Sequence, residues 1–353
     1  MDCGTASAGC TAARLLYDLL KVYTPPGSEE KALPVIAGHA ARLGLQASID
    51  KHGNIIVEPR DMDGMPVVLL ASHVDTVPGF IEPAWEGTVL RGRGAVDAKG
   101  PLAAMIAGLA LAYSEGLQCK AAAAALAGEE AESPGAWGLL SEGMVPPYVV
   151  IGEPTGGDGV AIGYRGSMKA RIECRDQGGH AASTSGAANR LVRALAQALA
   201  SNEGLVVTIL RAGEAWNVAP SRAEAVVDYR AAGTGVDMMR AAAGLCDAVA
   251  GEGCWCSEVS MMAPIRVELG GLVPRSLVRA LRAQGVRPRV VVKQGTSDMN
   301  ILGRAAASIA AYGPGDARLA HTDREAVTVE ELDTAARVYA SVLKSVCDSI
   351  QGG

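Results

Sequence analysis

The sequence lacks the patterns that mark several common classes of protein. No apolar stretch approaches the ~18 residues that a membrane span requires, and the amino terminus lacks the basic-then-apolar pattern of a secretory signal. No run of Lys or Arg occurs, and the net charge is -6, so neither a nucleic-acid partner nor a membrane partner is expected. These absences predict a cytoplasmic protein.

Several chemical signatures are also missing. The eight cysteines include no C-x-x-C pair, which disfavours a zinc ribbon or a thioredoxin-type site. We expect most of these cysteines to be small buried apolar residues. The motifs H-E-x-x-H, G-x-S-x-G and G-x-x-x-x-G-K-[ST] are absent, which disfavours zincin proteases, α/β-hydrolases and P-loop NTPases.

The length and composition predict a folded protein of two domains. The 353 residues exceed the usual size of one compact domain, and 49% of them are hydrophobic and 20% charged. Apolar strands alternate with helices up to about residue 163, and this α/β rhythm returns after residue 264. Between them, the order strand, helix, strand, strand, helix, strand indicates an inserted α+β module. The expected boundaries are 1–163, 164–264 and 265–353.

Periodicity and turn residues place the main elements. We expect helices at 11–22, 29–43, 102–113, 189–200, 238–250, 276–284, 299–302 and 330–346. We expect strands at 67–71, 121–127, 149–151, 167–175, 205–210, 222–229, 255–261, 289–292 and 308–312. Ser28, which follows the break at 24–27, is expected to cap the second helix.

Acidic residues and a histidine follow three of the predicted buried strands. His73 and Asp75 follow the first of these strands, Glu129 and Glu130 the second, and Glu153 the third. Open α/β sheets place their functional sites at the carboxyl ends of strands. The i, i+2 spacing points His73 and Asp75 the same way, so Asp75 is suited to orient His73 if His73 binds a metal ion.

Asp97 and His321 complete a candidate metal site. Asp97 stands where the third glycine of a G-x-G-x-x-G dinucleotide loop would be, which disfavours such a loop, and its two oxygens could bridge two cations. Each residue alone has a plainer interpretation: Asp97 as a helix cap, the Glu129–Glu130 pair as a solvated acidic turn, and His321 as an exposed loop histidine. Together with His73 they supply the ligands, the shared carboxylate and the spare base of a two-metal hydrolytic site.

Two further segments offer groups for binding a substrate. His180, in the inserted module, is suited to donate a hydrogen bond to a developing oxyanion. The turn Gly295-Thr296-Ser297-Asp298 offers backbone N–H groups that could cradle a carboxylate, although a plain helix cap before residue 299 is the simpler interpretation.

Ten short segments, taken in order along nearly the whole chain, resemble the M20 family of zinc aminoacylases and peptidases. They are SHVDTVP at 72–78, GRGAVDAKG at 92–100, GEE at 128–130, GEPT at 152–155, YRGS at 164–167, GHA at 179–181, NVAP at 217–220, DYR at 228–230, GTSD at 295–298 and HTDRE at 321–325. Any one of these segments is weak evidence, but the ordered set is specific. The sequence departs from the family pattern at Ala98 and at 131–134, and the second departure bears on the choice of substrate.

The resemblance implies an α/β, zinc-peptidase-like catalytic domain that holds two Zn²⁺ ions, with Co²⁺ as an alternative. The implied ligands are His73 and Glu153 on one ion, Glu130 and His321 on the other, and Asp97 between them. Asp75 would orient His73, and Glu129 would act as the general base. The catalytic domain is expected to have a mixed sheet with helices on both faces.

The resemblance also implies that the inserted module is a ferredoxin-like lid or dimerisation domain. In a homodimer, His180 would reach across the interface and polarise the scissile carbonyl group in the partner subunit. The residues expected to bind the substrate are Arg165, Asn217, Arg230, Gly295, Thr296 and Ser297.

Within the family, the compact length and the segments at 152–155 and 163–166 are most similar to hydrolases of lysine and arginine biosynthesis. Those enzymes release lysine or ornithine from the γ-carboxyl group of a glutamate that ends a small acidic carrier protein. Acetylornithine deacetylase, succinyl-diaminopimelate desuccinylase and other small-substrate aminoacylases or carboxypeptidases remain alternatives, and a non-catalytic metal-binding member is a remote one. A metal-dependent phosphatase or nuclease would need a basic phosphate clamp that the sequence does not offer.

Overall fold

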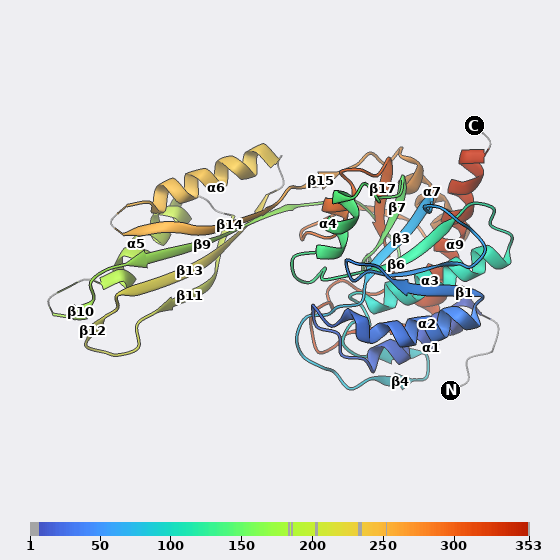
Figure 1. Cartoon of the computed structure of the whole chain (residues 1–353), viewed down its shortest axis with the longest axis horizontal. Helices are drawn as coiled ribbons and strands as arrows, with labels where there is room; N and C mark the ends of the chain where they lie inside the picture. Colours follow the sequence, from blue (N-terminus) through green and yellow to red (C-terminus); the bar gives the residue numbers. More distant parts are fainter. Residues whose placement is uncertain are drawn as a thin grey trace. The chain divides into compact units, whose positions relative to one another are not determined.

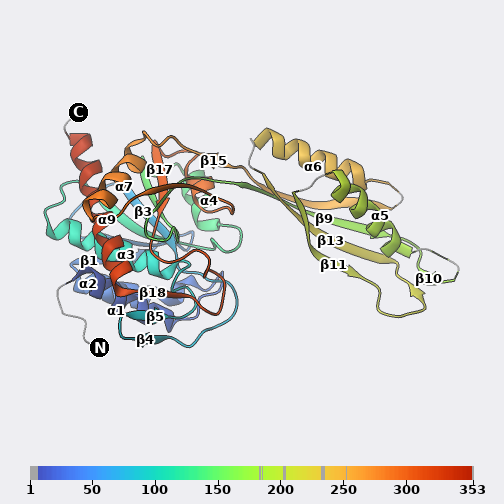
Figure 2. The same ribbon diagram turned by 180° about the vertical axis from the view of Figure 1, so that it is seen from behind.

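The chain forms two compact units (Figures 1 and 2). The computed structural model describes residues 7–182, 184, 186–201, 204–231, 235–251 and 253–351. The first unit comprises Met1–Gly163, Arg266–Val292 and Ser297–Gly353, and the second comprises Tyr164–Ile265 and Lys293–Thr296. The first unit is therefore discontinuous in sequence.

A mixed sheet forms the centre of the first unit. Its strands, in spatial order, are β1 (Leu45–Ile49), β2 (Ile55–Pro59), β6 (Ala121–Leu126), β3 (Val68–His73), β7 (Tyr148–Gly152), β17 (Ser308–Tyr312), β8 (Gly159–Tyr164) and β15 (Ile265–Arg266), and β16 (Arg289–Lys293) also pairs with β8. The four strands from β6 to β17 are parallel, and β1, β2 and β8 pair antiparallel. The carboxyl ends of β3, β6, β7 and β17 therefore meet at one edge.

Helices bury the central strands. In β3 and β6 every residue is buried, as expected of strands covered on both faces. The helices of this unit are α1 (Ala8–Leu20), the 3₁₀-helix η1 (Glu29–Ala32), α2 (Leu33–Arg42), α3 (Lys99–Ser114), α4 (Pro134–Ser141), α7 (Leu272–Ala283), α8 (Met299–Leu302) and α9 (Val329–Gln351). Helix α3 contacts β3, β6 and β7 and is itself covered by α1 and α9, which explains why its sequence is apolar all round.

A small sheet lies at the surface of the first unit and joins two loops that are distant in sequence. Its strands, in spatial order, are β18 (Ala326–Thr328), β5 (Val89–Arg91) and β4 (Ala84–Glu86). The antiparallel pairing of β5 with β18 places Arg91 opposite Ala326. The segment that leads to Asp97 is thereby held beside the segment that contains His321.

The second unit has the predicted order of strands and helices. Its main elements are β9 (Gly166–Arg175), α5 (Gly186–Ser201), β11 (Leu205–Ala212), β13 (Arg222–Ala231), α6 (Gly235–Val249) and β14 (Cys254–Met262), and a short pair is formed by β10 (Gly179–His180) and β12 (Val218–Ala219). The sheet order β11-β13-β9-β14 is ferredoxin-like. Met168, Ala170 and Ile172 alternate with more exposed residues, because only one face of the sheet packs against α5 and α6 (Figures 1 and 2).

Two expectations about local structure were wrong. Ser28 makes no capping hydrogen bond with its side chain, and η1 precedes α2. The break before α2 is held instead by the buried carboxylate of Glu29, which accepts hydrogen bonds from the amides of Gly27 at 3.0 Å and Gly128 at 2.9 Å. This bond to Gly128 connects the break to the loop that carries Glu129.

The described cysteines are also paired, which the expectation of small buried apolar residues did not include. Disulfides join Cys119 with Cys347, Cys174 with Cys254, and Cys246 with Cys256, and no cysteine in the described part of the chain is free. Separations of 228 and 80 residues hide the first two pairs from any search for local spacing. Among the described residues, no helix is long and apolar enough to cross a membrane.

Candidate metal centre

The predicted metal ligands of the first unit meet at the carboxyl edge of its parallel strands. His73 is the last residue of β3, Glu129 and Glu130 follow β6, and Glu153 follows β7. The loop after β17 contributes His321, and the loop before α3 contributes Asp97. The parallel register of these strands brings together ligands that are up to 248 positions apart in sequence, from His73 to His321.

Asp97 stands between the two histidines. Its Oδ1 lies 3.1 Å from Nε2 of His73, and its Oδ2 lies 3.3 Å from Nε2 of His321. Nε2 of His321 also lies 3.0 Å from Oε1 of Glu130. One carboxylate thus presents a different oxygen to each imidazole, which is the arrangement that a bridging ligand between two cations needs.

Two more carboxylates lie near the same nitrogen of His73. Its Nε2 lies 3.8 Å from Oε2 of Glu129 and 3.7 Å from Oε1 of Glu153. Two groups of ligand atoms are close enough to hold an ion, namely His73 with Asp97 and Glu130, and His73 with Glu129 and Glu153. The imidazole nitrogens and carboxylate oxygens match the ligand types of zinc. These residues therefore fit a metal centre, although the geometry alone leaves Glu129 as either a ligand or a base.

Asp75 contacts the ring of His73 through Nδ1, the nitrogen that does not face Asp97. The Nδ1 of His73 lies 2.9 Å from the backbone oxygen of Asp75 and 3.4 Å from its carboxylate Oδ1. The other carboxylate oxygen accepts a hydrogen bond of 3.0 Å from the amide of Glu130. Asp75 is fully buried. It therefore connects two of the predicted ligands without facing solvent.

The loop with His321 has an unusual backbone. His321 has a φ of 64°, in the left-handed region that few residues other than glycine adopt. Its side chain is half exposed, while that of Asp97 is only 14% exposed. His73, Asp75, Asp97, Glu129, Glu130, Glu153 and His321 together form the cluster. His321 lies on its exposed side, and His73 lies on its buried side.

Two residues of the matched motifs have a structural role that the sequence did not reveal. Glu325 has a fully buried side chain that accepts hydrogen bonds from the amides of Gly94, Val96 and Asp97. Arg93 forms a 2.6 Å ion pair with Glu325 and donates to the backbone oxygen of Thr322. A buried Glu beside a buried Arg gives no distinct signal in one sequence, because the two are separated by 232 positions.

The crowded charges shift the pKa values of both histidines upward. Burial lowers the pKa of His73, but hydrogen bonds with Asp75 and Asp97 outweigh it, so this pKa lies well above its ordinary value. Hydrogen bonds with Asp97 and Glu130 raise the pKa of His321 to about 10. In the metal-free protein, protonated histidines therefore balance the carboxylates, and bound cations must replace those protons.

The carboxylates respond in opposite directions. Burial opposes ionisation of Asp97, yet the bonds with His321 and His73 hold the pKa of Asp97 below its ordinary value. Burial raises the pKa of Glu129 well above its ordinary value, and the charges of Glu153 and Asp298 raise it further. Asp298 itself is buried, and that burial raises its pKa to about 7. A carboxyl group with a raised pKa is suited to accept and return a proton near neutral pH.

The remaining predicted residues lie mostly in the second unit. His180 is exposed on β10, and Asn217 accepts a hydrogen bond from the amide of Ala181 through its backbone oxygen. Arg230 forms a 2.8 Å ion pair with Asp228. Arg165, Gly295 and Thr296 belong to the same unit, and their contacts with a substrate stay a prediction.

Ser297 lies in the first unit, where its amide donates a 3.0 Å hydrogen bond to Oδ1 of Asn300. Its hydroxyl oxygen accepts a hydrogen bond from the amide of Met299. Ser297 therefore takes part in the start of α8, and a carboxylate that binds its amide must displace Asn300.

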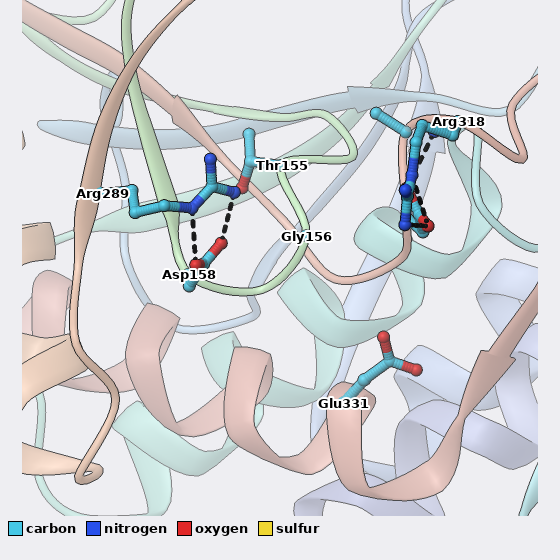
Figure 3. Close-up of a pocket in the computed structure, with 8 residues that line it drawn as sticks. Thr155, Gly156, Asp158, Arg289, Arg318 and Glu331 are labelled. Carbon is cyan, nitrogen blue, oxygen red and sulfur yellow. Dashed lines mark hydrogen bonds and ion pairs between the residues drawn. The ribbon is translucent and has the colours of Figure 1, made fainter.

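A pocket of about 560 Å³ lies on the loops after β7 and β17 (Figure 3). Its lining residues are Thr155, Gly156, Asp158, Arg289, Asp316, Ala317, Arg318 and Glu331. The guanidinium of Arg289 forms two hydrogen bonds with Asp158, and that of Arg318 forms three with Asp316 (Figure 3). None of the metal-ligand candidates lines this pocket, and both guanidinium groups in it are neutralised. The metal centre, and not this pocket, is the candidate site of chemistry.

Comparison with known proteins identifies the family. The family described as "Peptidase family M20/M25/M40" matches residues 69–345, which include all seven residues of the cluster. The chain belongs to this family. Its members are metal-dependent hydrolases of amide bonds, and this assignment agrees with the resemblance of the ten motifs.

Two relatives are similar over almost the whole chain. The "Putative [LysW]-lysine/[LysW]-ornithine hydrolase" of Aeropyrum pernix is 51% identical over 340 residues, which cover 96% of this chain and 97% of the relative. The "[LysW]-lysine/[LysW]-ornithine hydrolase" of Saccharolobus islandicus is 36% identical over 349 residues, which cover 95% and 96%.

Solved structures confirm the fold. A tripeptidase from Staphylococcus aureus superposes with a TM-score of 0.81 at 18% identity, covering 96% of this chain and 99% of that one. An M20 family metallo-carboxypeptidase from Sulfolobus solfataricus has a TM-score of 0.76 at 14% identity, with the same coverage. At these identities the likeness shows the fold alone, so the substrate has to be inferred from other observations.

Proposed function

We propose that the protein is a dizinc amidohydrolase that releases lysine, ornithine or both from the γ-glutamyl terminus of an amino-group carrier protein. The observation that carries this proposal is the 51% identity, over almost the whole of both chains, to a relative named for hydrolysis of [LysW]-lysine and [LysW]-ornithine. The cluster of two histidines and four carboxylates around Asp97 supplies the chemistry that such a reaction needs.

Five residues would hold the two ions. His73 and Glu153 would bind one ion, Glu130 and His321 would bind the other, and Asp97 would bridge them. The bound ions would supply Lewis-acid polarisation of the scissile carbonyl group and of the attacking water.

The protein's own groups would then move the protons. Glu129 would take a proton from the attacking water and return it to the departing amine, a role that suits its raised pKa. Asp75 would keep Nε2 of His73 directed at the ion, because its backbone oxygen and carboxylate both face Nδ1. Asp298 would keep the pKa of Glu129 high through its charge.

The second unit would complete the site. In a homodimer, His180 of one subunit would donate a hydrogen bond to the oxyanion that develops at the scissile carbonyl group bound in the other subunit. Arg165, Asn217, Arg230 and the turn Gly295–Ser297 would hold the α-carboxylate and backbone of the substrate. The exposed position of His180 supports this proposal.

A panel of matched substrates tests the proposed specificity. Amine release by the zinc-loaded protein should be measured with carrier-linked lysine, carrier-linked ornithine, N-acetylornithine and N-succinyl-diaminopimelate. We expect the carrier conjugates to be preferred by kcat/KM. A preference for either small acyl substrate would instead make the protein a deacylase and would overturn the carrier assignment. Zinc binding without hydrolysis of any of the four would favour a non-catalytic member of the family.

A further inference from the structure

We propose that Arg93 and Glu325, which bind no metal themselves, are a positioning pair that sets the separation of Asp97 and His321. Asp97 is the only one of the five predicted ligands whose two oxygens face both histidines, and His321 is the most exposed of the described ligands. Both lie in loops, so elements of regular structure do not fix their positions.

Glu325 fixes the loop that carries Asp97. Its Oε2 accepts hydrogen bonds from three amides, at 3.0 Å from Gly94, 3.2 Å from Val96 and 3.3 Å from Asp97. One buried carboxylate oxygen thus gathers the backbone that leads up to the bridging residue, together with the amide of that residue. A change in the position of Glu325 therefore moves Asp97.

Arg93 connects this loop to two others. It donates from Nη1 to Oε1 of Glu325 at 2.6 Å and to the backbone oxygen of Thr322 at 3.0 Å, the residue directly after His321. Its Nε donates to the backbone oxygen of Gly79, in the loop that follows β3. A planar guanidinium holds these directions together in a way that a lysine ammonium does not.

Stability alone is a weak explanation for this pair. The side chains of Arg93 and Glu325 are 7% and 0% exposed, and burying two charges costs about as much free energy as their attraction returns. The pairing of β5 with β18 already joins these two segments. What the pair adds is a fixed distance between two loops, each of which supplies a ligand.

The pair should affect the two ions unequally. The ion at His321 would take two of its contacts, Asp97 and His321, from the loops that the pair holds. The ion at His73 would keep His73, the last residue of β3, and Glu153, which directly follows β7. Weakening the pair should therefore lower the affinity for one ion more than for the other.

The test is the affinity of each ion in the variants Glu325→Gln and Arg93→Lys. The affinity for Zn²⁺ is measured by competition with a chelator, and the affinity for Co²⁺ is measured from the absorption spectrum of the bound Co²⁺. Outer contacts of this kind typically change metal affinity by about 10–100-fold. We expect a loss in that range for the ion at His321 and a loss of less than threefold for the ion at His73. kcat should recover when the metal concentration is raised. Asp323→Ala, which removes only the 95% exposed carboxylate at 3.4 Å from Arg93, and Arg318→Ala, in the same loop, are the matched controls and should leave both affinities unchanged.

Thermal unfolding of the metal-free variants separates positioning from stability. If either variant melts lower but binds both ions with unchanged affinity, the pair is structural and the proposal fails. Because metal binding is measured without a substrate, this result does not depend on whether the carrier conjugates prove to be the substrates.

Discussion

Replacing Glu129 with glutamine would decide between the two roles that the geometry allows for this residue. Oε2 of Glu129 and Oε1 of Glu153 lie at almost the same distance from Nε2 of His73, 3.8 and 3.7 Å. Either carboxylate could therefore be the second ligand, with His73, of the ion at His73. Glutamine has the same shape but can neither accept the proton of a water as a base nor bring a negative charge to a cation.

The expected loss follows from the proposed role. A positioned general base typically accelerates a reaction by about 10²–10⁴-fold, so Glu129→Gln should raise the activation barrier by about 3–5 kcal/mol. If Glu129 is not a ligand, two ions per chain should still bind. The same change removes a carboxyl group whose pKa is raised by burial, and such a group destabilises the fold above its ordinary pKa. The metal-free variant should therefore melt no lower than the parent protein at pH 7.

The assay combines steady-state amine release with metal analysis of the same sample. Glu132→Gln is the control, because Glu132 is an exposed carboxylate in the same turn and should affect neither quantity. Two bound ions with kcat within threefold of the parent would remove Glu129 from the role of base. Loss of one ion would instead make Glu129 a ligand, and Glu153 would then be the candidate base.

Three other predictions concern the metal ligands, the ionisation of the site and the disulfides. His321→Ala should reduce the bound ions from two to one, because His73 and Glu153 remain, and metal analysis after gel filtration would contradict this if both ions stay. In the metal-free protein, the raised pKa of His321 stabilises the fold fully below pH 6.5, and this contribution is lost as the pH rises through about 10. Ion binding must displace that proton, so affinity should increase from pH 6 to 9 with measurable proton release, and binding without proton release would refute this. Replacing Cys119 and Cys347 by serine opens a loop that spans 228 residues and should cost about 5.5 kcal/mol of unfolding free energy by chain entropy, so equal melting temperatures would count against the bond.

The sequence was most informative where a strand is fully buried. The apolar runs before His73, Glu129 and Glu153 predicted β3, β6 and β7, because strands covered on both faces need an uninterrupted apolar stretch. The edge strand β1 and its neighbour β2 were missed, because they are only partly buried and their residues alternate less clearly. Their hairpin has a local signal at Gly53–Asn54, a turn pair directly before the β-branched run at 55–57, which a closer search would have found.

The candidate site was predictable where it depends on these buried strands. The predicted ligands were brought together because parallel strands end at one edge, which is a property of topology that the order of motifs already implies. Contacts that depend on side chains from distant loops were not predictable: the bonds of Glu325 to the amides around Asp97 join positions about 230 apart. The disulfides were missed for the same reason, since no local spacing distinguishes a bonded cysteine from a buried one.

Two buried carboxylates outside the proposed set of ligands support this site. Asp75 contacts the imidazole of His73 and the amide of Glu130, which are predicted ligands of different ions. Glu325 accepts hydrogen bonds from the amides of Gly94, Val96 and Asp97, and Asp97 is the ligand that we propose both ions share. Their hydrogen bonds act on the backbone and on a ring nitrogen that faces away from Asp97, so they need no cation in order to form. The positions of the ligands are therefore set by the fold, and the cations compensate a concentration of negative charge that the fold has already assembled.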